Sequence, residues 1–534
     1  MDVMLAGGLM RFVQGLASAA PTMIVGLFIA GLLRYYLGTA DTIRLFGGNG
    51  LRSLPQSWLI GMLLPVCSIG VIPILREMKR MGIRPGAITA FALSAPLFNP
   101  LSLLYGLTLT RPYVIVGFAL ASLGVVTALG MVWDRLTSWT PMDDPKDPEV
   151  IGLRRIALTF FYMARELCGP TGVLTIVALS GLFLLGFLLP HGALQSSVEQ
   201  LDPFAPLKMA VAAVPIYAPP MLTMSQLGMM FAHGNSPGAA FCLLLLGTGV
   251  NFATLWWIAS SYGIKPTLIW FLVLFTVVVG FAYAVERPLI PPGVEPAGHT
   301  HAFDVYTNPL HSGPGLTMDS VVSKLAESIG LVERIGVGVL LVLALLGWVI
   351  RLRLDGWIER QETEKETEKI EAPKSTKRTA WNRPVSPRAV GITCLAGLVA
   401  FSVVACYAYY PSPGEVLEEM RLARTEVLSG AVSRDYKRAL LWIPILEEWS
   451  RKLEVGYAIR FFELRPYQQM QAHLLRKKLE LLEHAIEHAS LAIEQANGTT
   501  TSKSKIDLDQ ELREIDQLRA EISANGQRLA RAFR

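Results

Sequence analysis

Charge is scarce in this sequence of 534 residues. Asp, Glu, Lys and Arg make up 17% of it, 52% of the residues are apolar, and the mean hydropathy is +0.41. A soluble protein of this length rarely has that composition. The five cysteines are scattered singly, which excludes a disulfide-stapled secreted module. The net charge of +5 is too diluted over the chain to indicate nucleic-acid binding.

The sequence also lacks two common motifs of nucleotide and metal-dependent hydrolytic chemistry. No GxxxxGK[ST] phosphate loop and no HExxH is present. ATP hydrolysis at such a loop and a zinc protease of the HExxH type are therefore excluded. We expect no catalytic residue, no resident metal and no cofactor, so the protein is not expected to be an enzyme.

Long apolar stretches dominate what is present. A run of about 20 apolar residues matches the ~30 Å hydrocarbon core at ~1.5 Å rise per residue. The sequence therefore predicts an all-α polytopic membrane protein, whose first span is too long for a signal-peptide core and is expected to be retained. Eight full-length spans are expected, near Phe12–Tyr36, Ala87–Leu109, Pro112–Trp133, Pro170–Leu189, Gly238–Tyr262, Pro266–Ala284, Val337–Ile350 and Ala389–Tyr409.

Two further apolar regions, Gln56–Met81 and Leu207–Ala232, are interrupted by proline and small or polar residues. Proline removes a helix donor and clashes with the preceding turn, so each region is predicted to form two short helices around a non-helical point. The interrupting residues are Pro65, Cys67, Ser68, Gly70 and Pro73 in the first region, and Pro215, Pro219, Pro220, Thr223, Ser225 and Gln226 in the second.

The chain contains an internal repeat. Met78–Asn99 aligns without gaps on Met230–Asn251 at a constant offset of 152 residues. The identical pairs are Met78/Met230, Gly82/Gly234, Pro85/Pro237, Gly86/Gly238, Ala87/Ala239 and Asn99/Asn251. Each repeat is expected to hold one span, one interrupted region and two further spans.

The distribution of basic residues decides between two topologies for the interrupted regions. Cytoplasmic loops hold most Lys and Arg near span ends. With re-entrant hairpins and an external N-terminus, 23 of the 29 basic residues outside the tail become cytoplasmic and 6 external. Single crossings would instead place the larger share outside. Re-entrant hairpins are therefore favoured, and they give two inverted repeats of three transmembrane helices each, with hairpins entering from opposite faces.

The remainder of the chain is predicted to add two further transmembrane helices and a soluble α-helical hairpin. In that tail, apolar residues from Leu475 to Ile493 repeat at spacings of four and three, and a second such helix runs from Leu508 to Ile522, which indicates a coiled-coil seam. The expected domains are 1–135 and 169–286 (membrane repeats), 136–168 (cytoplasmic connector), 287–336 (external loop), 337–350 and 389–410 (transmembrane helices), 351–388 (charged cytoplasmic loop) and 411–534 (soluble domain).

One segment resembles a known family. LLPVCSIGVIPILREMKRMGIRPGAITAFALSAPLFNP, residues 63–100, is similar to the signature of the predicted permease family that includes the organoarsenical efflux permeases. The resemblance extends over roughly residues 10–285 and implies that Pro65, Cys67, Ser68, Gly70, Pro73, Asn99 and Pro100 occupy the central motif of the family. Ile69 stands where the family has a second cysteine. Soft metals and trivalent arsenicals prefer two or more sulfur ligands, so Cys67 alone fits them less well.

Transport of a small solute is therefore the expected function. Opposed half-helix tips near the membrane midplane are how many secondary transporters build a substrate site. The expected substrate-binding residues are Pro65, Cys67, Ser68, Gly70, Asn99, Pro100, Thr223, Ser225, Gln226 and Asn251. For Cys67, packing in a tight turn is as well supported as contact with solute. For Asn99 and Asn251, the equal alternative is that they form interhelical hydrogen bonds that hold the hairpins in place.

The expected setting is a prokaryotic inner membrane, with the lipid bilayer and a small solute such as a metalloid, metal or organic ion as partners, and with efflux as the direction. The C-terminal helices, expected outside the cell, offer a surface to a second copy or another protein. The rival interpretation is a membrane-anchored assembly or sensor protein that acts through this tail.

Overall fold

The computed structural model is helical, without strands, in the part of the chain that it describes: residues 3–48, 50–110, 112–137, 139, 154–290, 300–310, 318–353, 387–496 and 502–534. The chain divides into two compact units. Unit 1 comprises Met1–Gly106 and Pro112–Ala400, and unit 2 comprises Leu107–Arg111 and Phe401–Arg534. The predicted all-α class is confirmed. Much of the predicted connector 136–168, of the loop 287–336 and of the charged loop 351–388 lies outside the described residues.

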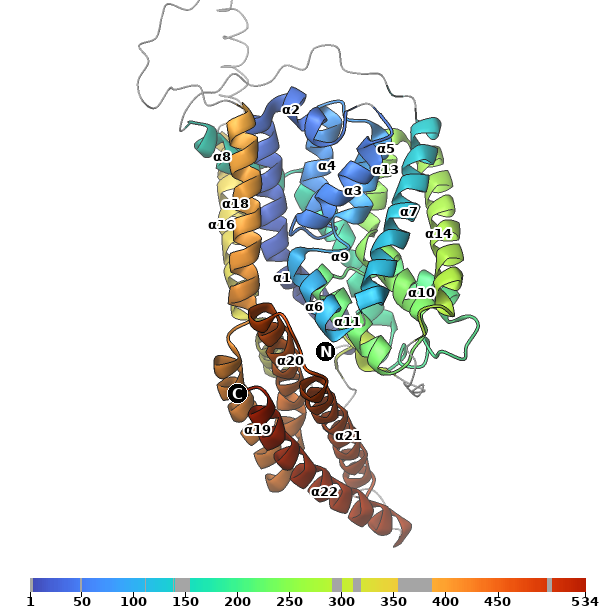
Figure 1. Cartoon of the computed structure of the whole chain (residues 1–534), viewed down its shortest axis with the longest axis vertical. Helices are drawn as coiled ribbons and strands as arrows, with labels where there is room; N and C mark the ends of the chain where they lie inside the picture. The colour runs from blue at the N-terminus through green and yellow to red at the C-terminus, as the bar shows by residue number, and fades with distance from the viewer. Residues whose placement is uncertain are drawn as a thin grey trace, which may run out of the picture. The chain divides into compact units, whose positions relative to one another are not determined.

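Unit 1 contains five helices long and apolar enough to cross a membrane, by length and composition, among the residues described. They correspond to five of the predicted spans, and Figure 1 shows most of them running in parallel over the height of the unit. The first combines α1 (Val3–Leu32), the π-helix η1 (Leu33–Leu37) and α2 (Gly38–Leu45); the others are α7 (Pro112–Leu136), α9 (Pro170–Leu188), α14 (Ile264–Glu286) and α16 (Leu331–Arg353).

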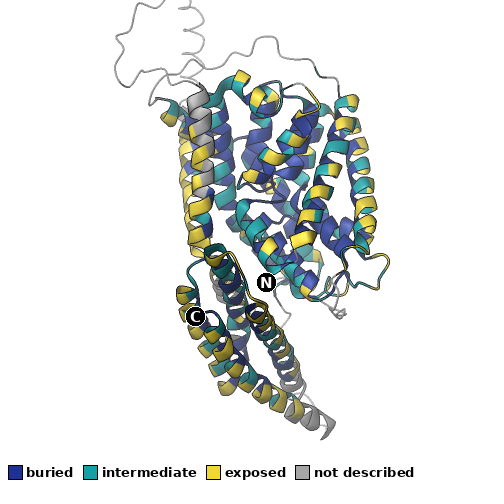
Figure 2. Ribbon diagram, viewed as in Figure 1, coloured by how far each residue is buried: buried dark blue, intermediate teal, exposed yellow. Residues whose placement is uncertain are grey.

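The outer faces of these long helices are apolar and exposed. Leu120 on α7, Leu272 on α14 and Leu345 on α16 are 60%, 65% and 63% exposed. Figure 2 shows such exposed residues along α7, α14 and α16, whereas the short helices between them are mostly buried. Continuous apolar stripes of this kind are stable against lipid and costly in water. Unit 1 is therefore built as a multi-pass membrane protein.

Two helix–loop–helix segments, hereafter the first and the second hairpin, occupy the predicted interrupted regions. The first consists of α3 (Ser53–Leu63) and α4 (Val71–Arg80), and the second of α10 (Ala205–Ala213) and α11 (Pro220–Ala232). The linking residues, 64–70 and 214–219, contain prolines, which cannot continue the helix hydrogen bonding. Each helical arm has 9 to 13 residues, a length of ~14–20 Å, which is too short to cross a bilayer.

The prediction of continuous spans over Ala87–Leu109 and Gly238–Tyr262 is wrong. The first is broken into α5 (Pro85–Ser94) and α6 (Pro100–Leu109). The second is broken into α12 (Pro237–Cys242), continued by the π-helix η2 (Leu243–Thr248), and α13 (Phe252–Tyr262), with a bend of 56°. Both breaks end at the repeated asparagine. Apolar periodicity alone does not reveal such a break, because the helices on either side are equally apolar.

The arms of the two hairpins attach toward opposite ends of α1. Glu77 of α4 pairs with Arg34, just beyond the C-terminal end of α1, at 3.2 Å between Oε1 and Nη1. Gln226 of α11 donates to the backbone of residues 300–310, hereafter the cap segment, at 2.8 Å. The cap segment is bonded in turn to the carbonyl of Val3, at the start of α1, at 3.2 Å. Since α1 has 30 residues, about 45 Å of helix separates its ends.

Three further helices complete the described secondary structure around unit 1. They are the amphipathic α8 (Arg154–Leu167), the one-turn helix η3 (His301–Phe303) within the cap segment, and α15 (Met318–Ser328). The apolar helix α18 (Pro387–Tyr409) leads from unit 1 into unit 2.

Unit 2 contains four long helices, α19 (Pro413–Ser433), α20 (Tyr436–Phe461), α21 (Pro466–Ala496) and α22 (Ser502–Ala532). The predicted helical pair is α21 and α22, and its seam residues Leu475, Leu479, Leu482, Ile486, Ala489, Ile515 and Ile522 lie in the core. The prediction of two helices is incomplete, because α19 buries Val416 and Met420, and α20 buries Ile443 and Leu446, in the same core. Their heavily charged outer faces obscure this apolar pattern in the sequence.

Candidate functional site

The first hairpin loop, residues 64–70, holds the motif that the sequence singled out. Cys67, Ser68 and Gly70 are buried, and the Gly70 N–H donates to the Cys67 Sγ at 3.3 Å. The loop lies directly on α1, since a Cβ added at Gly26 would be 1.9 Å from the Gly70 carbonyl oxygen. Glycine is needed at position 26 for this close backbone contact.

The second hairpin loop, residues 214–219, reaches the first. Tyr217, 1% exposed, lies beside the side chains of Cys67 and Thr22. This loop is seated on α9 in the same manner as the first loop on α1, because a Cβ at Gly181 would be 2.0 Å from the Pro215 carbonyl oxygen. The sequence analysis did not select Tyr217 or Thr22. The prolines on both sides of Tyr217 in VPIYAPP were the available signal.

Asn99 and Asn251 begin the second half of each broken helix. The Asn99 Oδ1 accepts from the backbone N–H of Ser102 at 2.7 Å, and the Asn251 Oδ1 accepts from the backbone N–H of Thr254 at 2.8 Å. These are N-cap hydrogen bonds, which satisfy otherwise unpaired donors at a helix start. The expectation that both residues lie inside continuous helices is therefore wrong, and Pro100 is the first residue of α6.

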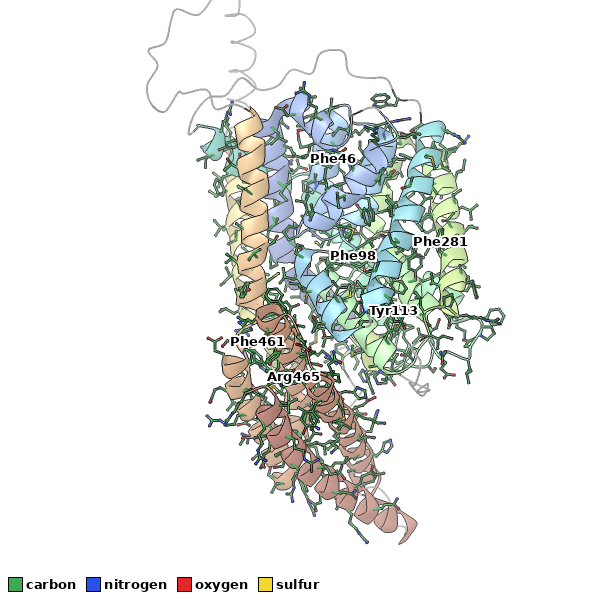
Figure 3. The ribbon with its side chains drawn as sticks, viewed as in Figure 1. Phe46, Phe98, Tyr113, Phe281, Phe461 and Arg465 are labelled. Atoms are coloured by element: carbon green, nitrogen blue, oxygen red, sulfur yellow. The ribbon has the colours of Figure 1, made fainter. Side chains whose placement is uncertain are left out.

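The two helix breaks and the two loops lie against one another. A Cβ at Gly249 would be 3.2 Å from the Leu97 side chain and 3.3 Å from the Leu93 carbonyl. A Cβ at Gly247 would be 3.4 Å from Ile216 of the second hairpin loop. We call residues 64–70, 95–99, 214–219 and 249–251 the central break region. Figure 3 labels Phe98, one of its members, at the middle of the unit.

Two polar atoms in the central break region have no hydrogen-bond partner among the described residues. They are the Ser68 Oγ and the Asn251 Nδ2, both on residues at most 1% exposed. The Tyr217 hydroxyl has the side chains of Cys67 and Thr22 as its polar neighbours. Leaving such a group unpaired away from water costs ~1–3 kcal/mol. The region contains no Asp, Glu, Lys, Arg or His. It therefore offers hydroxyl, amide and thiol groups, together with the ends of eight helical segments, to whatever enters.

Three of the remaining predicted site residues lie on α11, and each has different hydrogen-bond partners. Thr223 remains with the region, because its hydroxyl is 2.7 Å from the hydroxyl of Thr248 at the end of η2. Ser225 accepts from the Tyr105 hydroxyl at 3.3 Å. Gln226 is saturated by the cap segment, donating to one of its carbonyls and accepting from the Tyr306 hydroxyl at 2.9 Å. Pro65 is half-buried at the start of the first loop.

The cap segment holds a charged cluster outside the long helices. The Nδ1 of His301 is 2.7 Å from the Oδ2 of Asp304, and Gln195 donates to the same oxygen at 2.9 Å. Burial raises the pKa of Asp304, but the hydrogen bonds from His301 and Gln195 and the nearby His191 together lower it by more. The pKa of Asp304 therefore lies below its ordinary value. The cluster thus favours an ionised Asp304.

The two repeats also share a hydrogen bond from a glycine N–H to a carboxylate, which the sequence analysis missed. Asp134 accepts from the Gly86 N–H at 2.7 Å, and Glu286 accepts from the Gly238 N–H at 2.6 Å. Gly238 and Glu286 follow Gly86 and Asp134, respectively, by the repeat offset of 152 residues. Each carboxylate caps the start of a broken helix, where the helix dipole favours negative charge.

Ion pairs join the first hairpin to neighbouring elements, whereas the ion pair described on the second hairpin, Lys208 with Asp202 at 2.6 Å, is local. Glu77 of α4 accepts from Arg80 at 2.6 Å and from the Tyr162 hydroxyl at 3.1 Å, and Arg76 pairs with Glu166 at 2.7 Å. On the second hairpin, the positions 152 residues later are apolar or glycine, and the cap segment makes the polar contacts. The two hairpins are therefore held by different means. No group of His, Cys, Asp and Glu suited to a metal ion is present in the described part of the chain.

Broken helices that meet within an all-helical, multi-pass membrane unit are a common feature of secondary transporters. A family model described as a predicted permease, ArsP_1, matches residues 8–287, more than half of the chain. The chain belongs to this predicted permease family, and the resemblance found in the sequence is confirmed. The match ends before the cap segment, so it includes neither that segment nor the helices α19 to α22 of unit 2.

Among curated proteins, the UPF0718 protein YcgR of Bacillus subtilis is 30% identical over 92 residues. That alignment covers 17% of this chain and 31% of the relative, so the two proteins share less than a third of the relative's length. No solved structure matches the chain.

Proposed function

We propose that the protein is a secondary transporter that moves a small solute through the central break region. The observation that carries the proposal is the meeting of two hairpin loops and two helix breaks around buried polar groups, of which the Ser68 Oγ and the Asn251 Nδ2 have no partner among the described residues. Non-helical backbone at membrane depth is stable only where protein or a wet pathway surrounds it. A solute that accepts or donates hydrogen bonds would pair the Ser68 and Asn251 groups.

The proposed architecture is a pair of inverted repeats, each with three crossings and one re-entrant hairpin. Its support is the attachment of the hairpin arms toward opposite ends of α1, and the equivalent contacts of Asp134 and Glu286. In this arrangement the hairpins enter from opposite faces, and their loops meet in the membrane interior. The unequal attachment of the hairpins, through ion pairs on one side and the cap segment on the other, gives the two faces different gates.

The proposed solute is a metalloid, a metal or an organic ion, moved out of a prokaryotic cell across its inner membrane. A region without charged side chains favours species that are neutral or carry diffuse charge, because a desolvated compact ion would need a counter-charge. Cys67 adds one soft ligand, which suits binding that is weak enough for release. The distribution of basic residues supports an external position for the N-terminus and unit 2.

A matched pair of serine variants tests this site. Ser68 and Ser57 are both fully buried with an unpaired Oγ among the described residues, but Ser57 lies on α3 outside the central break region. After a resistance and uptake screen across metals, metalloids and organic ions has identified a solute, flux is measured for Ser68→Ala and Ser57→Ala. Loss of one hydrogen bond worth ~0.5–1.5 kcal/mol predicts a ~2- to 10-fold decrease for Ser68→Ala. Ser57→Ala should transport normally, and equal flux in both variants would reject the site.

A second comparison separates capping from solute contact at Asn251. Asn251→Ser keeps an oxygen that can cap α13 but removes the unpaired Nδ2, whereas Asn251→Leu removes both. We expect both variants to lose flux and only the leucine variant to lose ~1 kcal/mol or more of stability. Full flux in the serine variant would assign Asn251 to capping alone. The same comparison applies to Asn99.

A further inference from the structure

The C-terminal end of α20 lies level with the last turn of α18 within unit 2. Arg460 donates to the Tyr410 carbonyl at 2.9 Å, and its guanidinium lies 5.1 Å from the centre of the Tyr407 ring. One turn earlier, a Cβ at Gly456 would be 2.6 Å from the Pro411 carbonyl oxygen. The turn that follows α20 is therefore fixed beside the end of an apolar helix of 23 residues.

This turn exposes two large apolar side chains beside the charged residues Glu463 and Arg465. Phe461 is 58% exposed and Phe462 is 91% exposed, and Phe462 adopts a left-handed conformation with φ of 56°. Bulky residues rarely adopt that conformation, because the Cβ meets the backbone. At the start of α21, Tyr467 and Met470 are also exposed, by 53% and 46%. Figure 3 labels Phe461 and Arg465 at this end of the unit.

Exposed aromatic residues occur at no other place among the described residues of unit 2. The aromatic side chains farther along the helices, such as Trp442 and Trp449, pack against the core. Those that remain exposed are Tyr407, Tyr409, Phe461, Phe462 and Tyr467. Aromatic residues beside Arg side chains at the end of a membrane helix are typical of the lipid headgroup zone, where the rings contact acyl chains and the charges contact headgroups.

We propose that the turn around Phe461 and Phe462, with Tyr467 and Met470, inserts into the interfacial zone of the lipid bilayer beside α18 and anchors unit 2 to the membrane surface. The partner is lipid because the patch is continuous with the end of α18. The inference rests on the crossing of the membrane by α18, which the sequence predicts for residues 389–410 and which accompanies the proposed transport function. It assigns a lipid-binding surface to a region outside the permease family match.

The depth of spin labels in the full-length protein in liposomes tests the proposal. Phe462→Cys, Val404→Cys and Leu481→Cys are labelled in separate variants, and the accessibility of each label to oxygen and to a water-soluble nickel chelate is measured. Val404 lies on α18 and is 65% exposed, whereas Leu481 is 42% exposed and lies 15 residues beyond the start of α21. The expected ratio of oxygen to nickel accessibility is several-fold higher at positions 404 and 462 than at position 481.

The outcomes distinguish the inference from the crossing of the membrane by α18. A lipid-like label at 404 with a water-like label at 462 overturns the anchor and leaves the crossing of α18 intact. A water-like label at 404 overturns that crossing and the anchor with it. A label at 462 shielded from both reagents indicates a protein contact and also overturns the anchor.

A second set of variants tests whether Phe461 and Phe462 are required for insertion of the turn into the bilayer. With a spin label at Met470→Cys, the double change Phe461→Ser/Phe462→Ser should lower the ratio of oxygen to nickel accessibility several-fold. The control change, Leu422→Ser/Val432→Ser, replaces two exposed apolar residues of α19 and should leave the ratio unchanged. An equal ratio in both double variants would reject a role for the two phenylalanines.

Discussion

At the scale of single residues, Cys67 and Tyr217 connect the two hairpins. Each lies in a different hairpin loop, and the two side chains lie together beside Thr22. Cys67 already accepts a hydrogen bond from the Gly70 N–H, so its sulfur shapes the loop even without a solute. A serine oxygen could accept the same bond, because it is a stronger acceptor than sulfur.

Cys67→Ser is therefore expected to leave flux almost unchanged, provided that the solute is not thiophilic. Cys242→Ser is the control, since Cys242 is equally buried but lies on α12. Resistance to arsenicals and copper, with protein levels measured in parallel, checks the prediction. If only Cys67→Ser lost resistance, the sulfur would be a solute ligand. In that case Ile69→Cys should strengthen binding of trivalent arsenicals, because a second sulfur adds a bond at little further entropy cost.

At the scale of helices, glycines allow the loops to touch the long helices. The carbonyl of Gly70 lies against Gly26 of α1, and the carbonyl of Pro215 lies against Gly181 of α9. A methyl group at either glycine would overlap the carbonyl oxygen, and the packed surroundings give it no space to move. The depth of each hairpin in the membrane unit thus depends on the absence of a single side chain.

Gly26→Ala is expected to displace the first hairpin loop. Overpacking of this kind costs ~1–3 kcal/mol, and a displaced site should lower flux at least as strongly as loss of a polar contact. Flux and thermal unfolding of the purified protein are the measurements. Gly280→Ala on α14 is the control, because a Cβ there meets nothing within 4 Å, and it should behave like the parent. A fully active Gly26→Ala protein would contradict the close contact.

Unit 2 contains a buried ion pair between α20 and α21. Glu454, which is 3% exposed, is hydrogen-bonded to Arg476, and Arg476 donates to the Ser450 hydroxyl at 3.2 Å. Burial raises the pKa of Glu454, and Arg476 opposes that rise. Removing only one partner of such a pair leaves an uncompensated charge in the core.

Glu454→Leu should therefore destabilise unit 2 by about 2–3 kcal/mol, below the full cost of a buried charge because Arg476 keeps some contact with water. The double variant Glu454→Leu/Arg476→Leu should recover most of this loss. Pulse proteolysis of the full-length protein in urea, with cleavage products assigned to unit 2, measures both. Equal stability of the two variants would show that the pair does not act as a unit.

At the scale of the whole molecule, topology follows from the placement of charge. In intact cells, Ser320→Cys and Ser429→Cys are expected to react with an impermeant thiol reagent, whereas Ser375→Cys is expected to be protected. The parent protein supplies the background, since the cysteines among the described residues are buried or half-buried. Labelling at position 375 from outside would overturn the inverted-repeat arrangement.

Deletion of residues 411–534 separates transport from a function of the tail. The central break region lies entirely within unit 1, so a transporter should retain solute flux after the deletion. A membrane-anchored assembly or sensor protein would instead lose its activity. Flux in cells, normalised to protein level, is the measurement, and complete loss of flux with normal expression would favour the rival function.

Some helix breaks of the site could be predicted from the sequence and others could not, depending on the residue that causes the break. Prolines in the loops 64–70 and 214–219 break helices by their covalent structure, so both interruptions could be predicted from the sequence. The breaks before Asn99 and Asn251 were missed, because asparagine in an apolar run is compatible with a helix as well as with a cap. The contact of Gln226 with the cap segment could not be predicted, because that segment is remote in sequence and lies outside the repeats.

The sequence by itself determined the membrane class, the five long spans, the repeat and the family, because composition, hydropathy and motif spacing are local properties of the chain. Only the tertiary structure decided which interrupted segments meet. The contact of Cys67 with Tyr217 and that of Leu97 with Gly249 join residues about 150 positions apart. Such contacts depend on how the helices pack. Backbone carbonyls lie so close to single glycines that one added methyl group would overlap them, and the local sequence does not reveal this closeness.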